Sequence, residues 1–133
     1  MDLFAALDRL DALRLPRDQY AVFGSGPLAV RGIRPAADLD IVVLPGLWAD
    51  LAARLPLAPK AGAPRILVEE IEIWPDWHPA AGPPAEIVAT ADVFDGYRFA
   101  TLARVLAWKR ALARPKDVTD VELITRYLAR GGS

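Results

Sequence analysis

The chain has 133 residues, of which 53% are hydrophobic and 25% are charged, a composition typical of one folded domain rather than of a disordered segment. Its net charge of −1 and pI of about 5.8 exclude the strongly basic surface of a general nucleic-acid-binding protein. The absence of cysteine excludes disulfides, thiol nucleophiles and thiolate metal sites, and a single histidine cannot form a zinc site alone.

The apolar residues are spread along the chain rather than gathered in one segment. No run approaches the ~18 consecutive apolar residues of a membrane-spanning helix. Asp2 and Asp8 interrupt the region in which a signal peptide would carry its apolar segment. We therefore expect a cytoplasmic protein with no membrane partner.

The first half of the chain alternates helical and strand patterns. Leu3, Leu7 and Leu10 recur at helical spacing and predict an amphipathic helix that Pro16 closes. The elements expected next are a strand at 20–23, a turn at 24–26, a short helix ended by Gly32, a strand at 38–44 and a helix at 47–55.

The second half predicts a loop at 56–64 and then one β-branched strand at 65–74. A loop at 75–85, a short helix at 86–91 and an extended segment at 93–99, turning at Asp95-Gly96, are expected to follow. Two helices at 101–113 and 117–129, separated by Pro115, complete the order. This order predicts an α/β (α+β) fold: one domain over residues 1–133 with a small mixed β-sheet covered by helices.

Two aspartates open the second predicted strand, in the run Asp38-Leu39-Asp40-Ile41. Side chains alternate along a strand, so Asp38 and Asp40 are expected on one face, with Cα atoms about 6.6–6.8 Å apart. The third predicted strand repeats this pattern with Glu70 and Glu72. If the two strands are neighbours, their carboxylates converge on one side of the sheet.

Such a group of anions is costly unless some carboxyls are protonated or a cation neutralises them. Oxygen ligands without histidine or cysteine favour Mg²⁺ or Mn²⁺ over zinc. Two such ions would stabilise the attacking and leaving oxygens of a phosphoryl displacement. The alternative is that these acids only cap strand ends in solvent.

The turn Gly24-Ser25-Gly26 precedes the aspartates. Such a turn before a helix exposes backbone N–H groups that can bind phosphate, and Ser25 adds a hydroxyl. No Gly-Lys-Ser/Thr sequence follows, so the turn is not a Walker A loop. A dinucleotide fingerprint is disfavoured because Gly32 and Pro35 break the helix early.

The helix predicted at 101–113 carries one lysine, Lys109, within its apolar stripe. A lysine in this position either extends past its neighbours to solvent or points at an anion. In the last predicted helix, Asp117 is expected to be the N-cap, with Asp120 in the first turn.

Gly24-Ser25, Arg34 and Asp38-Leu39-Asp40-Ile41 together resemble the minimal nucleotidyltransferases of the DNA polymerase beta-type superfamily. Arg34, Lys109 and the stretch at 116–120 are similar to the abortive-infection toxin branch of that superfamily. The resemblance runs in order from about residue 20 to residue 128. It implies an enzyme that binds a nucleoside triphosphate with Mg²⁺ and transfers its NMP to a hydroxyl acceptor, with RNA among the candidates.

The resemblance also implies roles for individual residues. Asp38, Asp40 and Glu72 would be the catalytic, metal-binding acids, with Glu70 as the alternative third acid. The nucleotide would contact Gly24, Ser25, Arg34 and Lys109. Asp117 would support this group of residues.

The chain lacks a sizeable second domain to hold an acceptor. A homodimer or a small helical protein partner is therefore expected to complete the cleft, docking near the loop at 75–85. Trp74 and Trp77 lie there and either form that interface or pack on the domain's own core. The alternative function is a nucleotide-binding, antitoxin-like or regulatory module acting through such a partner in a toxin–antitoxin pair.

Overall fold

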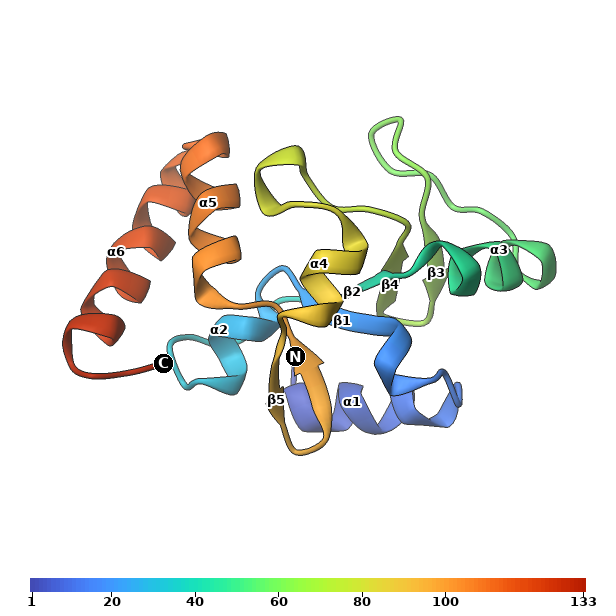
Figure 1. Ribbon diagram of the computed structural model, residues 1–133, viewed down its shortest axis with the longest axis horizontal. Helices are drawn as coiled ribbons and strands as arrows, with labels where there is room; N and C mark the ends of the chain where they lie inside the picture. The colour runs from blue at the N-terminus through green and yellow to red at the C-terminus, as the bar shows by residue number, and fades with distance from the viewer.

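Short apolar strands form the centre of the molecule. The computed structural model, which describes residues 1–133, joins six strands in one sheet of order β3-β4-β2-β1-β6-β5 (Figure 1). The strands are β1 (Tyr20–Phe23), β2 (Leu39–Val43), β3 (Ile66–Val68), β4 (Ile71–Trp74), β5 (Asp92–Phe94) and β6 (Tyr97–Phe99). The sheet is mixed, because β2 is antiparallel to β1 but parallel to β4.

Helices and short turns connect the strands. The α-helices are α1 (Leu3–Ala12), α2 (Gly26–Val30), α3 (Pro45–Arg54), α4 (Pro84–Ala89), α5 (Leu102–Leu112) and α6 (Pro115–Ala129), with 3₁₀ turns at Arg17–Gln19 and Pro79–Ala81. Asp2 caps α1 by accepting the N–H of Phe4 at 3.0 Å. Thr101 caps α5 by accepting the N–H of Arg104 at 3.3 Å.

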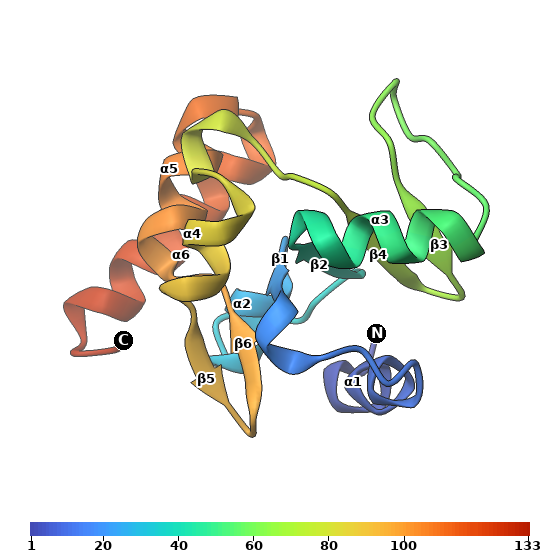
Figure 2. The same cartoon turned by 45° about the vertical axis from the view of Figure 1, so that its right-hand side comes forward.

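The strand residues alternate between two cores, one on each face of the sheet. Val22 and Ile41 belong to the core that includes α1 and α3, whereas Phe23 and Val42 belong to the core that includes α4, α5 and α6. Figure 2 shows α4, α5 and α6 gathered on one side of the central strands. The predicted mixed sheet covered by helices is confirmed at this level.

The prediction of one strand at 65–74 is wrong. The chain turns at Glu69 and Glu70, so that β3 and β4 form an antiparallel hairpin. Glu69 adopts a φ of 54°, in the left-handed region that residues other than glycine rarely occupy. The unbroken apolar and β-branched pattern on both sides hid this turn, since neither glycine nor proline marks it.

The last helix begins two residues earlier than predicted. Pro115 opens α6 instead of separating it from α5, and Arg114 is the N-cap. Asp117 is therefore not the N-cap; it lies in the first turn and accepts the backbone N–H of Arg114 at 3.1 Å. No helix of the chain is both long enough and apolar enough to cross a membrane.

Candidate active site

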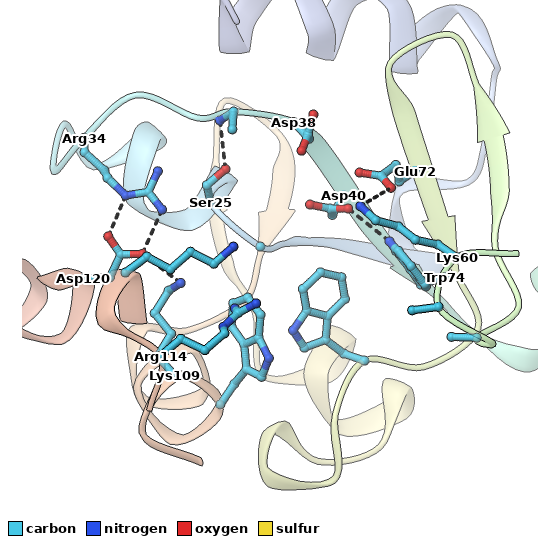
Figure 3. Close-up of a pocket in the computed structure, with 17 residues that line it drawn as sticks. Ser25, Arg34, Asp38, Asp40, Lys60, Glu72, Trp74, Lys109, Arg114 and Asp120 are labelled. Atoms are coloured by element: carbon cyan, nitrogen blue, oxygen red, sulfur yellow. Dashed lines mark hydrogen bonds and ion pairs between the residues drawn. The ribbon is translucent and has the colours of Figure 1, made fainter. Parts of the chain in front are cut away.

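A cavity of about 400 Å³ opens beside the ends of β1, β2 and β4 (Figure 3). Its volume lies within the usual range for small-molecule sites. The predicted site residues that line it are Gly24, Ser25, Arg34, Asp38, Asp40, Glu72 and Lys109. Residues from the start, middle and end of the chain thus meet at one place.

The pairing of β2 with β4 brings the acids of the cavity together. Asp40 is the direct register partner of Glu72, and Asp38 immediately precedes β2. Asp40 and Glu72 alternate with buried apolar residues that face the α1 side, so both carboxylates face the α4–α6 side. The expected convergence of carboxylates from two neighbouring strands is confirmed for Asp40 and Glu72.

Gly24 allows the backbone to approach Asp40 closely. Its φ is 65°, and a Cβ at this position would lie 2.5 Å from Asp40 Oδ2. Both the backbone conformation and the contact therefore require glycine. The neighbouring Ser25 Oγ accepts the N–H of Ala37 at 3.2 Å, which ties the turn to the segment before β2.

The carboxylate of Asp40 is held by an indole. Trp74 Nε1 donates to Asp40 Oδ1 at 3.0 Å. Burial raises the pKa of Asp40 to about 7, and the nearby Glu72 carboxylate adds to this rise although the Trp74 hydrogen bond opposes it.

Glu72 is paired with two cations from the segment before it. Arg65 Nη1 lies 2.5 Å from Glu72 Oε1, and Lys60 Nζ lies 3.6 Å from the same oxygen. Lys60 comes from the loop between α3 and β3 and also lines the cavity. Lys60 lies in a predicted loop, and Arg65 would lie on the opposite face from Glu72 in the single strand predicted at 65–74, so neither contact was expected.

The acids do not form a ready metal centre. No three acidic or histidine side chains are grouped as ligands for one ion. One oxygen of Asp40 is occupied by Trp74, and one oxygen of Glu72 by Arg65 and Lys60. Asp38, by contrast, has no hydrogen bond or ion pair within the chain and is exposed.

A second charged wall faces the acids and comes from α5, α6 and the segment before β2 (Figure 3). Arg34 binds both oxygens of Asp120, with Nε at 2.7 Å from Oδ1 and Nη2 at 2.8 Å from Oδ2. Lys109 Nζ also lies 2.8 Å from Asp120 Oδ2. Burial alone would raise the pKa of Asp120, but the hydrogen bonds from Arg34 and Lys109 hold it below its usual value.

Asp117 contacts residues of this wall but does not line the cavity. It is fully buried, accepts Arg114 Nε at 2.6 Å and lies 3.5 Å from Lys109 Nζ. The hydrogen bonds from Arg114 hold the pKa of Asp117 below its usual value. Lys109, only 4% exposed, does not extend past its neighbours to solvent and instead contacts two carboxylates of its own chain.

Three tryptophans form the apolar end of the cavity: Trp74, Trp77 and Trp108. Trp77 stacks on the fully buried Phe23 with ring centroids 4.8 Å apart, and Trp108 meets the edge of Phe23 at 5.6 Å. Of the two alternatives expected for these residues, packing on the domain's own core is observed for Trp77, whereas Trp74 lines the cavity.

Of the acids predicted as metal ligands, only Glu70 lies elsewhere. It occupies the turn between β3 and β4, bonds Arg9 and does not line the cavity. Sequence reasoning did not assign Asp120 to the site. A signal for a buried acid was available in the sequence. Asp120 lies four residues before Ile124 and three after Asp117, so all three residues share one face of α6, and that face is buried.

Comparisons of the chain with models of protein families, with curated proteins and with solved structures found no match.

Proposed function

We propose that the chain is a Mg²⁺-dependent nucleotidyltransferase that binds a nucleoside triphosphate in this cavity and transfers NMP to a hydroxyl acceptor. The observation that carries the proposal is the register of β2 and β4, which sets Asp40 beside Glu72 at a cavity. Gly24, which the resemblance to minimal nucleotidyltransferases assigns to the triphosphate, lies against Asp40. The nucleotidyltransferase fold itself is part of this proposal.

The charges of the cavity fit a ligand with both anions and a bound cation. Five basic and four acidic side chains line it, and most of the acids lie on the side of Asp38. The basic side chains of Arg114 and Lys116 lie at the opposite wall. Phosphate oxygens would meet the basic residues, and Asp38 and Asp40 would hold a divalent cation whose charge would relieve the crowding of the acids.

The donor atoms are of the kind that Mg²⁺ prefers, since they are carboxylate oxygens, although no three of the side chains are grouped around one ion position. Asp38 and Asp40 would hold the ion, with Glu72 as the third acid. When bound, Mg²⁺ would neutralise charge on the phosphate oxygens during displacement.

The proposed reaction is an in-line displacement at the α-phosphorus. A bond forms between the acceptor hydroxyl oxygen and the α-phosphorus, and the bond to the bridging oxygen breaks, so that pyrophosphate leaves with its electron pair. The hydroxyl proton passes to a carboxylate of the site, for which Glu72 is the candidate. Lys109 and Arg34 fix the wall opposite the acids through Asp120.

The test is nucleotide binding and transfer by the purified chain. We expect Asp38→Asn combined with Asp40→Asn to abolish Mg²⁺-dependent NTP binding in calorimetry while the fold persists. Glu70→Gln is the matched control, because this acid lies outside the cavity. Unchanged metal-dependent binding in the folded double variant would remove the site assignment.

Radiolabelled NTPs incubated with the chain and a cell extract identify the acceptor. We expect label from an α-phosphate, but not from a γ-phosphate, to appear in an acceptor. Label transferred from the γ-phosphate would instead identify a kinase and overturn the proposed reaction.

A further inference from the structure

The three tryptophans of the cavity enclose an apolar space of their own. Trp74, Trp77 and Trp108 line a pocket of about 190 Å³, and all three also line the larger charged cavity. The apolar pocket therefore adjoins the polar one. A ligand that fills both has an aromatic or apolar end and a charged end.

The rings of this wall are fixed before a ligand binds. Trp77 meets Trp74 and Trp108 edge to face, with centroids 5.9 Å and 5.0 Å apart. Trp74 is held by its hydrogen bond to Asp40, and Trp77 by its stack on Phe23. Fixed aromatic faces favour binding because little side-chain entropy remains to be lost.

One polar atom of Trp77 has no partner within the chain. Its Nε1 is buried and has no hydrogen-bond partner in the chain, which is costly for an indole. All three rings nevertheless remain half-buried and accessible to the cavity. Such an arrangement is typical of a surface that receives another flat ring.

The charge of the cavity decides between two kinds of ligand that aromatic walls bind. An organic cation would favour a surplus of acids, as well as the tryptophan faces. Basic side chains outnumber acidic ones here, and the lysine next to Trp108 lies over its ring, with Nζ 4.5 Å from the centroid. These observations favour an anion that carries a planar base.

We infer that Trp74, Trp77 and Trp108 form the nucleobase subsite of the cavity and that this subsite prefers purines. The inference rests on the proposed function, since it assigns the base of the nucleotide whose phosphates meet the charged end. A purine presents a larger ring surface than a pyrimidine and so gains more from stacking. Trp108, on α5, is the residue to vary, because it makes no hydrogen bond that its loss would leave unpaired.

The experiment uses tryptophan fluorescence of the full chain. Trp48 on α3 is the only other tryptophan and packs against the core on the α1 side, so Trp48→Phe leaves tryptophan emission from the cavity alone. In this background we expect ATP and adenosine to quench emission, and CTP to bind more weakly than ATP. Inorganic tripolyphosphate should bind without quenching.

Trp108→Leu in the same background should weaken ATP binding about ten-fold, within the range of one base–aromatic stack, and leave tripolyphosphate affinity unchanged. Trp108→Phe should retain most of the affinity, and its melting curve checks that folding is intact. Two outcomes would refute the base subsite but not the phosphate site. One is equal ATP affinity in the folded Leu variant, and the other is binding of ATP and tripolyphosphate without any quenching by ATP. Quenching by adenosine without triphosphate binding would instead contradict the proposed transfer reaction, and failure of every ligand to bind would refute both.

Discussion

Lys109 Nζ lies 2.8 Å from Asp120 Oδ2, and the two residues are only 4% and 3% exposed. The lysine is thus the shared cation of two buried carboxylates, since Asp117 also contacts it. We expect Lys109→Met to lower the free energy of unfolding by about 1–3 kcal/mol, because each acid loses a charged partner in a buried setting. Urea unfolding measures this loss.

The matched control for Lys109 is Lys116, which lines the same cavity but is exposed and makes no ion pair. Lys116→Met should change the unfolding free energy by no more than about 0.5 kcal/mol. Equal unfolding free energies of the two variants would show that the ion pairs of Lys109 make no net contribution to stability. A stability gain in the Lys109 variant would favour a purely apolar interior at this position.

Asp40 predicts a specific dependence of stability on pH. Its pKa in the folded chain is about 7, above the ordinary value of 3.8, so the folded state holds a proton that the unfolded state has lost between these pH values. Metal-free wild type should lose up to about 1.4 kcal/mol of stability per pH unit across this window, with little further change above it. Asp40→Asn retains an acceptor for Trp74 and should abolish this loss.

Thermal unfolding in chelator-containing buffers from pH 4 to pH 8 compares the two proteins. The Asn variant should be the more stable at pH 8, and the difference should shrink toward pH 4. Parallel stability curves would contradict the raised pKa.

Gly24 and Gly46 form a matched pair for substitution by alanine. At Gly24 the added Cβ would meet Asp40 Oδ2 at 2.5 Å in a backbone with φ of 65°, so we expect a loss of at least about 1–2 kcal/mol. At Gly46, the second residue of α3, nothing lies within 4 Å, and alanine should stabilise the helix by at most about 0.5–1 kcal/mol, the value for the middle of a helix. Chemical denaturation measures the free energy of unfolding of both variants. The change should be a loss for Gly24→Ala and a gain for Gly46→Ala, so its sign is sufficient to test the prediction.

Arg34 binds Asp120 through two nitrogens of its guanidinium group, which lysine cannot reproduce. Arg34→Lys should therefore cost about 0.5–1.5 kcal/mol of stability. The exposed pair between Arg54 and Asp50 on α3 gives the control, and Arg54→Lys should be nearly neutral. If the two variants lose similar amounts of unfolding free energy, the two-nitrogen contact of Arg34 does not stabilise the protein more than a single exposed ion pair.

Local patterns predicted most of the secondary structure and the facing of the acids. Alternation along the 38–44 segment placed Asp38 and Asp40 on one side, and helical spacing put Lys109 in a buried stripe. The partners of these residues depend on contacts that no local pattern encodes. Asp40 meets Glu72 only because β2 and β4 are neighbours, and Lys109 meets Asp120 only because α6 folds back along α5.

The missed features have the same origin. Glu69 adopts a left-handed conformation without glycine, so nothing in the run from Ile66 to Trp74 announces the hairpin. Lys60 reaches Glu72 from the loop before β3, and Arg65 reaches it across the hairpin that the single predicted strand did not contain. Trp108 meets Trp77 across a long stretch of sequence, which a reading limited to neighbouring residues cannot detect.

Arg34 and Asp120 are separated by 86 residues of sequence, yet they close one wall of the cavity. During synthesis on the ribosome, Asp38, Asp40 and Glu72 emerge well before the acid that anchors this wall. The emerging chain therefore carries its acids before the cavity can be complete, and Lys109 gains both its carboxylates only when α6 is made. Under the proposed function, a nascent chain that ends before α6 should therefore bind no nucleotide.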